Sequence, residues 1–330
     1  MKTAIIGAGF SGLATAWHLL LHAPKTKITL FDAKGIGGGA SGLAAGLLHP
    51  LGGAHAKLNW CGKEGMASTL QLLQAAAQFS GEEIYQQQGI LRPAVDQDQV
   101  TDYLQRAEQY PETTWLDVRE VQKRVKGIAS YPALWIRDGI AVDCPRYLQA
   151  LWAICVASGS EFFPVTIQRL EELKEFDCVI VATGPAMINY PEFQHLALKP
   201  LKGQILQLEW PKNLPPLELP LNSYIYIVMD RNQTSCWAGS TFERQPSTHA
   251  PDIATAKALI LPGAIKLIPD LESALIQQCL AGMRAVTLNH RPLYGKFGDK
   301  LWGITGLGSK GLLYHSYIAE QLVKEILDTL

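Results

Sequence analysis

Three glycines near the N-terminus limit most strongly what this chain can fold into. Gly7, Gly9 and Gly12 form a G-x-G-x-x-G pattern between an apolar run, residues 3–6, and an amphipathic stretch, residues 13–21. The run suits a buried parallel strand, and the stretch has helical spacing. In such a unit the first glycine allows a tight turn, the second lets backbone approach a pyrophosphate, and the third lets helix and strand pack closely. The pattern favours a dinucleotide site in an α/β fold over a purely structural glycine turn.

An acidic residue follows at the spacing that such a site requires. Asp32 closes a second apolar run, residues 28–31, twenty residues after Gly12. A carboxylate at the end of that strand can accept both ribose hydroxyls of an adenosine, and it disfavours the 2′-phosphate of NADP. The unit therefore predicts FAD or NAD, without choosing between them.

A run with very few side chains comes next. Residues 37–55 contain seven glycines and no charged residue. We interpret this run as backbone that lies flat against the cofactor, where Cβ atoms would collide with it.

The remaining pieces of a nucleotide-binding domain lie far along the chain. An NAD dehydrogenase usually continues with βαβ units in direct succession, whereas here residues 68–89 predict a helix and the stretch from about 80 to 135 is polar and irregular. Nucleotide-domain character then returns in a helix over 145–159, a strand and turn over 161–173, a buried strand over 176–186, and a strand, glycine-rich turn and long helix over 301–327.

This layout resembles the FAD-dependent D-amino-acid oxidase superfamily, which includes glycine oxidase, sarcosine oxidase and D-amino-acid dehydrogenase. The resemblance covers essentially the whole chain, including the strand V-I-V-A-T-G at 179–184 and the turn G-L-G-S-K-G at 306–311. It implies an α/β fold with a discontinuous Rossmann-like FAD-binding domain and a mostly antiparallel β-sheet substrate domain. The implied division assigns 1–78, 145–197 and 284–330 to the first domain, and 79–144 and 198–283 to the second.

The same resemblance implies how FAD is held. Val165 matches the position whose backbone contacts adenine, residues 40–47 the loop along the pyrophosphate and isoalloxazine, and residues 307–313 the turn at the pyrimidine end of the flavin. The FAD is expected to be non-covalent, because no cysteine lies in 282–287, where some relatives attach flavin. The predicted cofactor-binding residues are Gly7, Gly9, Phe10, Ser11, Gly12, Asp32, Ala33, Ala40, Ser41, Ala45, Gly46, Leu47, Val165, Thr183, Gly184, Leu307, Gly308, Ser309, Lys310, Gly311 and Leu312.

Within the superfamily, one member looks closer. Residues 40–50, 282–295 and 306–322 are similar to the FAD domain of the bifunctional enzyme that removes the carboxymethyl group from 5-carboxymethylaminomethyl-uridine in tRNA. The sequence contains no counterpart of the methyltransferase domain fused to that enzyme. It also has His49 where that loop would have a tyrosine.

An arginine is the first candidate for substrate binding. Substrates of this superfamily usually carry a carboxylate, for which a bidentate arginine is the natural partner. Arg284 matches the substrate arginine of the family, and Arg291, seven residues on, is its rival. The alternative for either is a structural ion pair at the domain junction.

Four further residues are candidates for the catalytic site. Tyr224 and Tyr226 fall on one face of a strand predicted over 223–232, and they either line the active site or pack on the core. His49 either sits over the flavin or caps its loop. Lys310 stands at the start of a helix, where a cation interacts unfavourably with the macrodipole. It either faces a negative partner such as reduced flavin, which would offset this, or reaches into water.

Composition narrows the partners and the compartment. Lys plus Arg (29) nearly balance Asp plus Glu (30), and no basic block suggests a nucleic-acid tail. The six cysteines include no C-x-x-C pair, which predicts reduced thiols in a cytoplasmic protein and no zinc or other metal site. No uninterrupted apolar stretch reaches the ~18 residues that a membrane span needs.

Together these observations predict an FAD-dependent oxidoreductase. The expected reaction is oxidation of the C–N bond of an amino acid or an N-substituted glycine-type amine by hydride transfer to flavin N5. A stand-alone tRNA wobble-uridine oxidoreductase and a non-catalytic flavin-binding protein are the alternatives. Oxygen and a quinone both stay open as electron acceptors.

Overall fold

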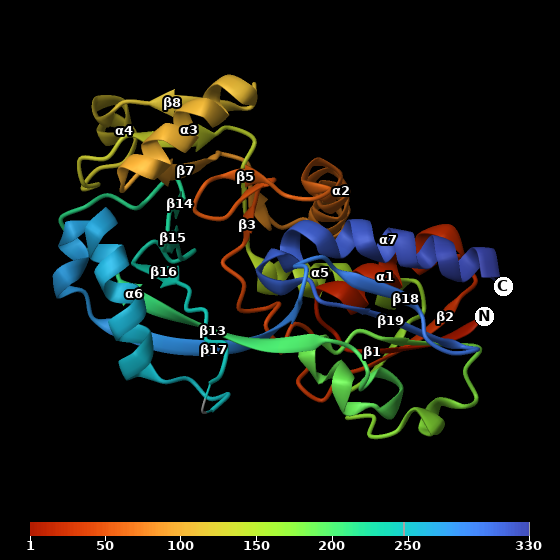
Figure 1. Ribbon diagram of the computed structural model, residues 1–330. Helices are drawn as coiled ribbons and strands as arrows, with labels where there is room; N and C mark the ends of the chain where they lie inside the picture. The colour runs from red at the N-terminus through yellow and green to blue at the C-terminus, as the bar shows by residue number, and fades with distance from the viewer. Residues whose placement is uncertain (247, 330) are drawn as a thin grey trace.

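Two large β-sheets organise the computed structural model, which describes residues 1–246 and 248–329 (Figure 1). A six-stranded sheet lies beside both chain termini, and an eight-stranded sheet lies at the other end of the molecule. Each sheet forms the centre of one lobe, so the expected two-domain α/β fold is confirmed.

The six-stranded sheet contains the predicted dinucleotide unit. At its centre, β1 (Lys2–Ile6) pairs in parallel with β2 (Lys27–Phe31) and with β12 (Cys178–Val181). The other strands are β11 (Glu161–Phe163), β19 (Leu301–Thr305) and β18 (Leu293–Lys296). All pairings are parallel except that of β18 with β19. Strands from the start, middle and end of the chain therefore pair directly, as a discontinuous domain requires.

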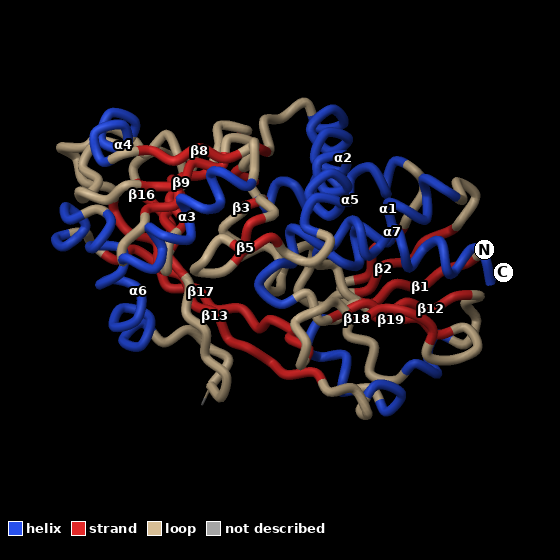
Figure 2. The backbone as a smooth tube through the Cα atoms, turned by 45° about the horizontal axis from the view of Figure 1, so that its top comes forward, coloured by secondary structure: helices blue, strands red, loops and turns tan. Residues whose placement is uncertain are grey.

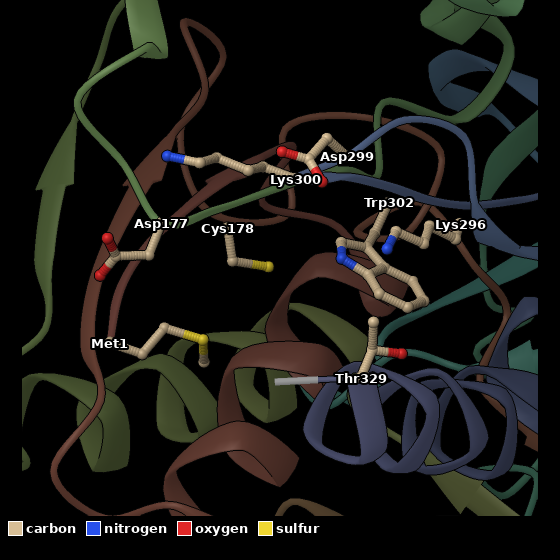
Figure 3. Close-up of a pocket in the computed structure, with 8 residues that line it drawn as sticks. All are labelled: Met1, Asp177, Cys178, Lys296, Asp299, Lys300, Trp302 and Thr329. Carbon is tan, nitrogen blue, oxygen red and sulfur yellow. The ribbon is translucent and has the colours of Figure 1, made fainter.

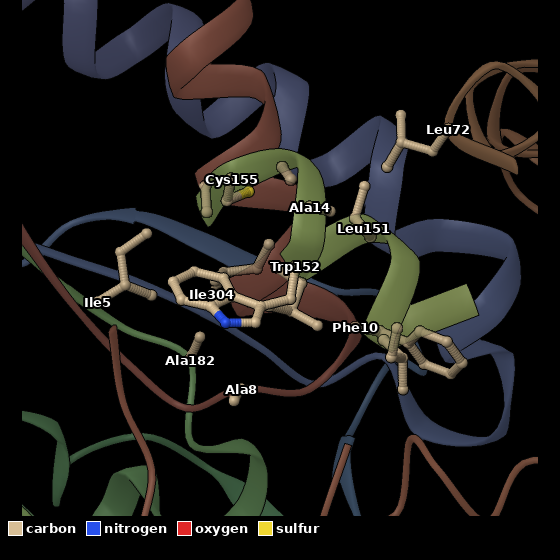
Figure 4. Close-up of a cluster of buried hydrophobic side chains, with 14 of the residues drawn as sticks. Ile5, Ala8, Phe10, Ala14, Leu72, Leu151, Trp152, Cys155, Ala182 and Ile304 are labelled. Atoms are coloured by element: carbon tan, nitrogen blue, oxygen red, sulfur yellow. The ribbon is translucent and has the colours of Figure 1, made fainter. Parts of the chain in front are cut away.

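Helices bury one face of this sheet. The helices on this face are α1 (Phe10–His22), α5 (Cys144–Ala157) and α7 (Gly311–Thr329), and α2 (Gly62–Ser80) packs on α5 and α7. Their apolar sides share one core with the strands, in which Ile5, Leu151 and Ile304 are fully buried (Figure 4). The other face is covered by the 3-10 turns η1 (Leu170–Leu173), η2 (Gly184–Asn189) and η3 (Pro191–Phe193).

The eight-stranded sheet has the order β17–β13–β16–β15–β14–β7–β9–β8. Every pairing in it is antiparallel except that of β14 with β7. Its strands are β7 (Ile90–Pro93), β8 (Thr113–Leu116), β9 (Ala133–Ile136), β13 (Leu198–Glu209), β14 (Leu221–Asn222), β15 (Tyr226–Met229), β16 (Ser235–Gly239) and β17 (Ile276–Thr287). The helix α6 (Ile253–Leu267) packs on β13 and β16, and its core includes Val121 of α4 (Val118–Arg124).

Two long strands join the lobes. β13 and β17 pair along their length and run from the eight-stranded sheet towards the six-stranded one (Figures 1 and 2). At its end β17 forms a bridge between Val286 and Leu307, in the turn before α7. The expected domain limit at 283/284 falls inside β17, so this strand extends through it.

Short strands occupy the connection between the lobes. β3 (Leu47–Leu48) and β6 (Tyr85–Gln86) flank β10 (Ile140–Val142), and β4 (Leu51–Gly52) pairs with β5 (Lys57–Leu58).

Two local predictions are wrong. The helix expected over 68–89 begins earlier, at Gly62, and ends at Ser80, because Gly81 adopts φ 69° and terminates it. The stretch from 80 to 135 is not irregular, since it contains β7, β8, β9, α4 and the helix α3 (Gln97–Gln109). The sequence does carry a signal for α3, since Val100, Tyr103, Leu104 and Ala107 have helical spacing after the N-cap Asp96, but polar residues dominate the stretch.

Two buried histidines lie between α1, α5 and α7. His315 accepts a hydrogen bond at Nε2 from Tyr147 Oη (2.7 Å), and its Nδ1 donates to the carbonyl of Leu312 (3.0 Å). His18 Nε2 lies 3.2 Å from Ser316 Oγ. Burial lowers the pKa of His18 to about 4 and that of His315 to about 3.

We therefore expect acid to destabilise the fold through these histidines. Their folded-state pKa values lie below the usual 6.5, so the unfolded chain binds more protons once the pH falls below 6.5. This contribution to stability is present above pH 6.5 and is lost as the pH falls towards 4, by at most about 1.4 kcal/mol per pH unit for each histidine. Unfolding midpoints measured by circular dichroism should fall between neutral pH and about pH 5, less steeply in His315→Asn. A midpoint that does not change over this range would contradict the assignment.

Candidate active site

The turn after β1 is as close-packed as the G-x-G-x-x-G pattern predicts. Gly7 has φ 109°, and a Cβ on Gly12 would lie 1.9 Å from the Gly7 carbonyl oxygen. A side chain at Gly12 would force α1 away from β1, and one at Gly7 would meet the Ala182 carbonyl oxygen after β12 at 2.5 Å. Gly9 differs, because its Cβ would meet the hydroxyl of Ser41 at 2.8 Å.

The N-terminal end of α1 fits an anionic cofactor. Gly9 caps this helix without a side-chain hydrogen bond, and its first turn contains no acid, so the positive end of its dipole is not neutralised by the chain. Asp32 accepts hydrogen bonds from the backbone N–H groups of Ala8 (2.9 Å) and Lys34 (2.8 Å), which fixes the carboxylate beside the turn. The Phe10 side chain is buried against His315, so only the backbone of Phe10 faces the turn, where its N–H donates to Ser41 Oγ (3.0 Å).

The glycine-rich run folds as a series of tight turns followed by β3 and β4. A Cβ on Gly42 would lie 2.4 Å from the Gly37 carbonyl oxygen, and one on Gly46 would lie 1.9 Å from that of Val142. These glycines are thus required by contacts within the chain, a reason that differs from the collision with cofactor inferred from the sequence. The run also reaches the long strands, since a Cβ on Gly282 would lie 3.0 Å from Ala40 Cα.

Two further groups stand at the carboxyl ends of the parallel strands, where open α/β sheets bind ligands. The Thr183 hydroxyl, just after β12, is buried and has no hydrogen-bond partner among the described residues. Val165, just after β11, is 46% exposed. A buried hydroxyl without a partner fits a cofactor that would supply one.

The turn between β19 and α7 brings Lys310 to the same region. Lys310 is half-buried at the start of α7, and burial lowers the pKa of its ammonium group. Among the residues that the structure describes, it forms no ion pair with a carboxylate, and the first turn of α7 contains no acid. A partly desolvated cation at this end of a helix fits an anionic group supplied by the cofactor.

Arg284 lies on β17 and extends across the neighbouring strand. Its Nη2 donates to Ser240 Oγ (2.8 Å) and its Nη1 to the Thr241 carbonyl (3.3 Å). A Cβ on Gly203 of β13 would lie 2.4 Å from the guanidinium carbon, so this glycine makes room for it. The ring of Phe242 lies over the guanidinium, 4.9 Å away.

The guanidinium keeps its charge uncompensated. Burial lowers the pKa of Arg284, and no carboxylate pairs with it in the described part of the chain. A structural ion pair, which was the alternative reading of this arginine, is therefore wrong for the described residues. Arg291 is exposed and lies over the ring of Trp60, 5.5 Å from its centroid.

Tyr226 and Tyr224 do not share the predicted strand. β15 begins at Tyr226, and Tyr226 lies over Gly239 of the next strand, whose Cβ would be 2.6 Å from the phenol oxygen. Burial raises the pKa of Tyr226, and Arg284 offsets part of this rise. Tyr224 lies in the preceding loop, is 58% exposed, and donates to the Asp96 carboxylate at the start of α3 (3.0 Å). The pairing on one face is wrong because the strand starts three residues later than predicted.

His49 joins the two lobes at the end of β3. Its Nε2 lies 2.9 Å from the Asn222 amide nitrogen on β14, and Nδ1 is buried without a described partner. Burial and the nearby Arg92 lower the pKa of His49 to about 3, so the imidazole is neutral.

Sequence reasoning missed several groups around Arg284 and His49. They are Gly203, Ser240, Thr241, Phe242 and Asn222. None belongs to a local motif: antiparallel pairing brings the groups around Arg284 together, and Asn222 meets His49 across two different sheets. Ala238, which precedes Gly239, Ser240 and Thr241, is not part of any motif that would have revealed this site.

One pocket lies at the other edge of the six-stranded sheet. A cavity of about 500 Å³ is lined by Met1, Asp177, Lys300 and other residues at the amino ends of β1, β12 and β19 (Figure 3). Parallel sheets bind dinucleotides at the opposite edge, so this cavity is not the cofactor site. Within the described residues, no His, Cys, Asp and Glu side chains cluster as a metal site would require, and no helix has the length and apolarity to cross a membrane.

Comparison with known proteins identifies the family. Residues 2–325 match the family described as DAO, FAD dependent oxidoreductase. Glycine oxidase of Bacillus licheniformis is 25% identical over 355 residues, which cover 98% of this chain and 92% of that protein. The bifunctional tRNA 5-methylaminomethyl-2-thiouridine biosynthesis protein of Marinobacter nauticus is 27% identical over 369 residues, which cover 98% of this chain and 55% of that protein. This chain thus spans about half of that relative.

The fold agrees with a solved structure. Glycine oxidase from Bacillus cereus superposes with a TM-score of 0.84 at 22% identity, over 100% of this chain and 95% of that one. The α1 turn and the buried Thr183 hydroxyl, which has no partner among the described residues, fit an FAD cofactor. Because the family model matches residues 2–325, the chain belongs to the DAO family of FAD-dependent oxidoreductases, and FAD is its cofactor.

Proposed function

We propose that this enzyme oxidises the C–N bond of a small amine that carries a carboxylate, either a free amino acid or an N-substituted glycine. The main support for this proposal comes from the hydrogen-bond donors of Arg284. A guanidinium has five N–H donors, and in the described part of the chain two hydrogen bonds, both to uncharged oxygens, occupy those of Arg284. Donors remain for a bidentate carboxylate, which is the anion that this geometry suits.

Tyr226, which lies near the arginine, and His49, which we propose for the same site, carry no negative charge and so suit an anionic substrate. Tyr226 stays protonated, since burial raises its pKa, and the lowered pKa of His49 keeps it neutral. Arg284 therefore supplies the charge of this site, while Tyr226 can orient the amine by a hydrogen bond. We propose Arg284 and Tyr226 as substrate-binding residues and His49 as a neutral wall residue. Tyr224 is a less suitable candidate, because its hydroxyl is engaged by Asp96.

We propose that FAD is bound without a covalent link, along the α1 turn, the 40–47 loop, Thr183 and the turn before α7. A bound flavin accepts a hydride from the carbon beside the amine nitrogen. The chain's part is to orient that carbon through the carboxylate and to exclude water. No cysteine lies in 282–287, and Cys279 on the same strand is half-buried.

Lys310 should tune the reduction potential of the flavin. Replacing it with methionine removes a cation that stabilises the negative charge of reduced flavin, and the midpoint potential should fall by about 20–40 mV, which is about 1–2 kcal/mol for a two-electron couple. Spectroelectrochemistry of the wild type and Lys310→Met measures this difference. An unchanged potential would mean that Lys310 reaches into water instead.

A second candidate substrate is the carboxymethylaminomethyl arm of a modified tRNA uridine. It is favoured by the 27% identity to the bifunctional tRNA enzyme over 98% of this chain. The same arginine could bind its carboxylate. A gel shift with tRNA that weakens as salt increases would support this substrate, because phosphate contacts release counterions.

Anaerobic reduction tests the proposal across substrate classes. Holoenzyme is mixed with glycine, sarcosine, iminodiacetate, D-alanine, L-alanine or L-proline, and bleaching of the flavin absorbance is followed. At least one of these amines should reduce the flavin completely. If none does and the carboxymethylaminomethyl nucleoside in tRNA does, the second candidate replaces the first.

A further inference from the structure

An ion pair between a buried lysine and a partly exposed glutamate lies near the arginine without contacting it. Lys202 on β13 is 1% exposed, and its Nζ lies 3.8 Å from Glu243 Oε2. The same two residues exchange backbone hydrogen bonds of 3.0 and 2.9 Å. Removing two charges from water is costly, so a buried pair is weak evidence of a purely stabilising role.

The other carboxylate oxygen of Glu243 anchors its surroundings. Glu243 Oε1 accepts from Thr241 Oγ1 (2.6 Å) and from Gln204 Nε2 (2.9 Å). Gln204 is fully buried, and its Oε1 accepts from the backbone N–H of Asp252, the residue that caps α6 (2.6 Å). The segment 240–243 is thus tied to β13 and, through Gln204, to the start of α6.

That segment also makes three of the contacts to Arg284. Ser240 Oγ and the Thr241 carbonyl accept its two hydrogen bonds, and the Phe242 ring lies over the guanidinium. Phe242 is 58% exposed, so little else packs on that side of the segment to hold it. The buried partners of Thr241 and Glu243 therefore fix the atoms that orient the guanidinium.

We propose that the Lys202–Glu243 pair is a positioning device for Arg284, which holds segment 240–243 so that the free donors of the guanidinium face the substrate carboxylate. This inference rests on the proposed function of Arg284. Glu243 is a positioning residue, because it acts through Thr241 and Ser240.

The test uses holoenzyme of the wild type, Glu243→Ala and a control, Glu209→Ala. Glu209 lies on β13, the strand of Lys202, and pairs with exposed Lys212. It stands at the end of β13, seven residues from Lys202, and among the described residues it makes no hydrogen bond or ion pair with segment 240–243. The dissociation constant of acetate, measured by the perturbation of the flavin spectrum, should rise about ten- to a hundredfold in Glu243→Ala and stay unchanged in the control. With a substrate, KM should rise by a similar factor and kcat should fall by less.

Two further measurements separate positioning from general damage. Trypsin should cleave after exposed Arg244 several-fold faster in Glu243→Ala, because the segment is released. The single variant Glu243→Gln leaves Lys202 as an unpaired buried cation, whereas Lys202→Met with Glu243→Gln removes both charges and keeps an amide oxygen for Thr241. Acetate affinity should therefore recover to within about threefold of wild type in the double variant.

The possible outcomes are distinct. If the wild type binds acetate and Glu243→Ala binds it equally well, the positioning role is wrong although the proposed function stands. If neither acetate nor any amino acid perturbs the spectrum of the wild-type flavin, the proposed function fails. Arg284 then binds no carboxylate, and the Lys202–Glu243 pair has no such role to support.

Discussion

Replacing Arg284 with alanine should lower kcat/KM for a carboxylate-bearing amine by about 30-fold to several thousand-fold. Loss of a buried, hydrogen-bonded charge partner costs about 2–5 kcal/mol, and each 1.36 kcal/mol corresponds to a factor of ten. The fall should appear mainly in KM if Arg284 only binds the carboxylate, and also in kcat if Arg284 orients the reacting carbon. Stopped-flow reduction of the flavin under anaerobic conditions measures both parameters.

Arg291→Ala is the matched control, because it removes a nearby arginine that is exposed and stacked on Trp60. It should change kcat/KM by less than about threefold, as expected for a surface substitution. Equal effects of the two substitutions would contradict the assignment of the clamp to Arg284. Both variants should keep the flavin content of wild type, since neither arginine lies in the α1 turn or the glycine-rich run.

Gly12→Ala should abolish FAD binding and destabilise the cofactor lobe. The new methyl group would lie 1.9 Å from the Gly7 carbonyl oxygen, an atom of the backbone that cannot rotate away. α1 would have to move from β1, which opens the core beneath it and misplaces the N–H groups proposed to face the pyrophosphate. We expect a loss of about 3 kcal/mol or more and protein purified without yellow colour.

Gly39→Ala provides the comparison for this substitution. A Cβ at Gly39, in the glycine-rich run, would meet no atom of the chain within 4 Å. This variant should keep the flavin content and the thermal midpoint of wild type. Normal flavin content in Gly12→Ala, measured as the ratio of visible to ultraviolet absorbance, would show that close packing at this turn is not needed.

The elements that sequence reasoning predicted correctly are local. The strands and helices around Gly7, Cys178 and Gly308 follow from short apolar runs, glycine turns and helical periodicity, all of which lie within a few dozen residues. The resemblance then supplied the two-lobed arrangement. Helix α3 was missed although Val100, Tyr103, Leu104 and Ala107 have helical spacing, because polar residues dominate the rest of that stretch.

The surroundings of Arg284 could not be predicted in the same way. Gly203, Gly239 and Ser240 belong to no sequence motif, and their role follows from the register in which β13, β16 and β15 pair. The position of Tyr224 was wrong for the same reason, since a start of β15 at Tyr226 releases Tyr224 to the surface. A shift in strand start or register changes which side chains share a face.

A comparison of matched amines tests the central claim most directly. Each amine that reduces the flavin is compared, under anaerobic conditions, with the same amine lacking its carboxylate, such as sarcosine with dimethylamine or glycine with methylamine. The account predicts that the carboxylated amine reduces the flavin at least about a hundredfold more efficiently in wild type, and that Arg284→Ala removes most of this preference. Equal reduction by both members of a pair, or a preference that survives Arg284→Ala, would contradict the account.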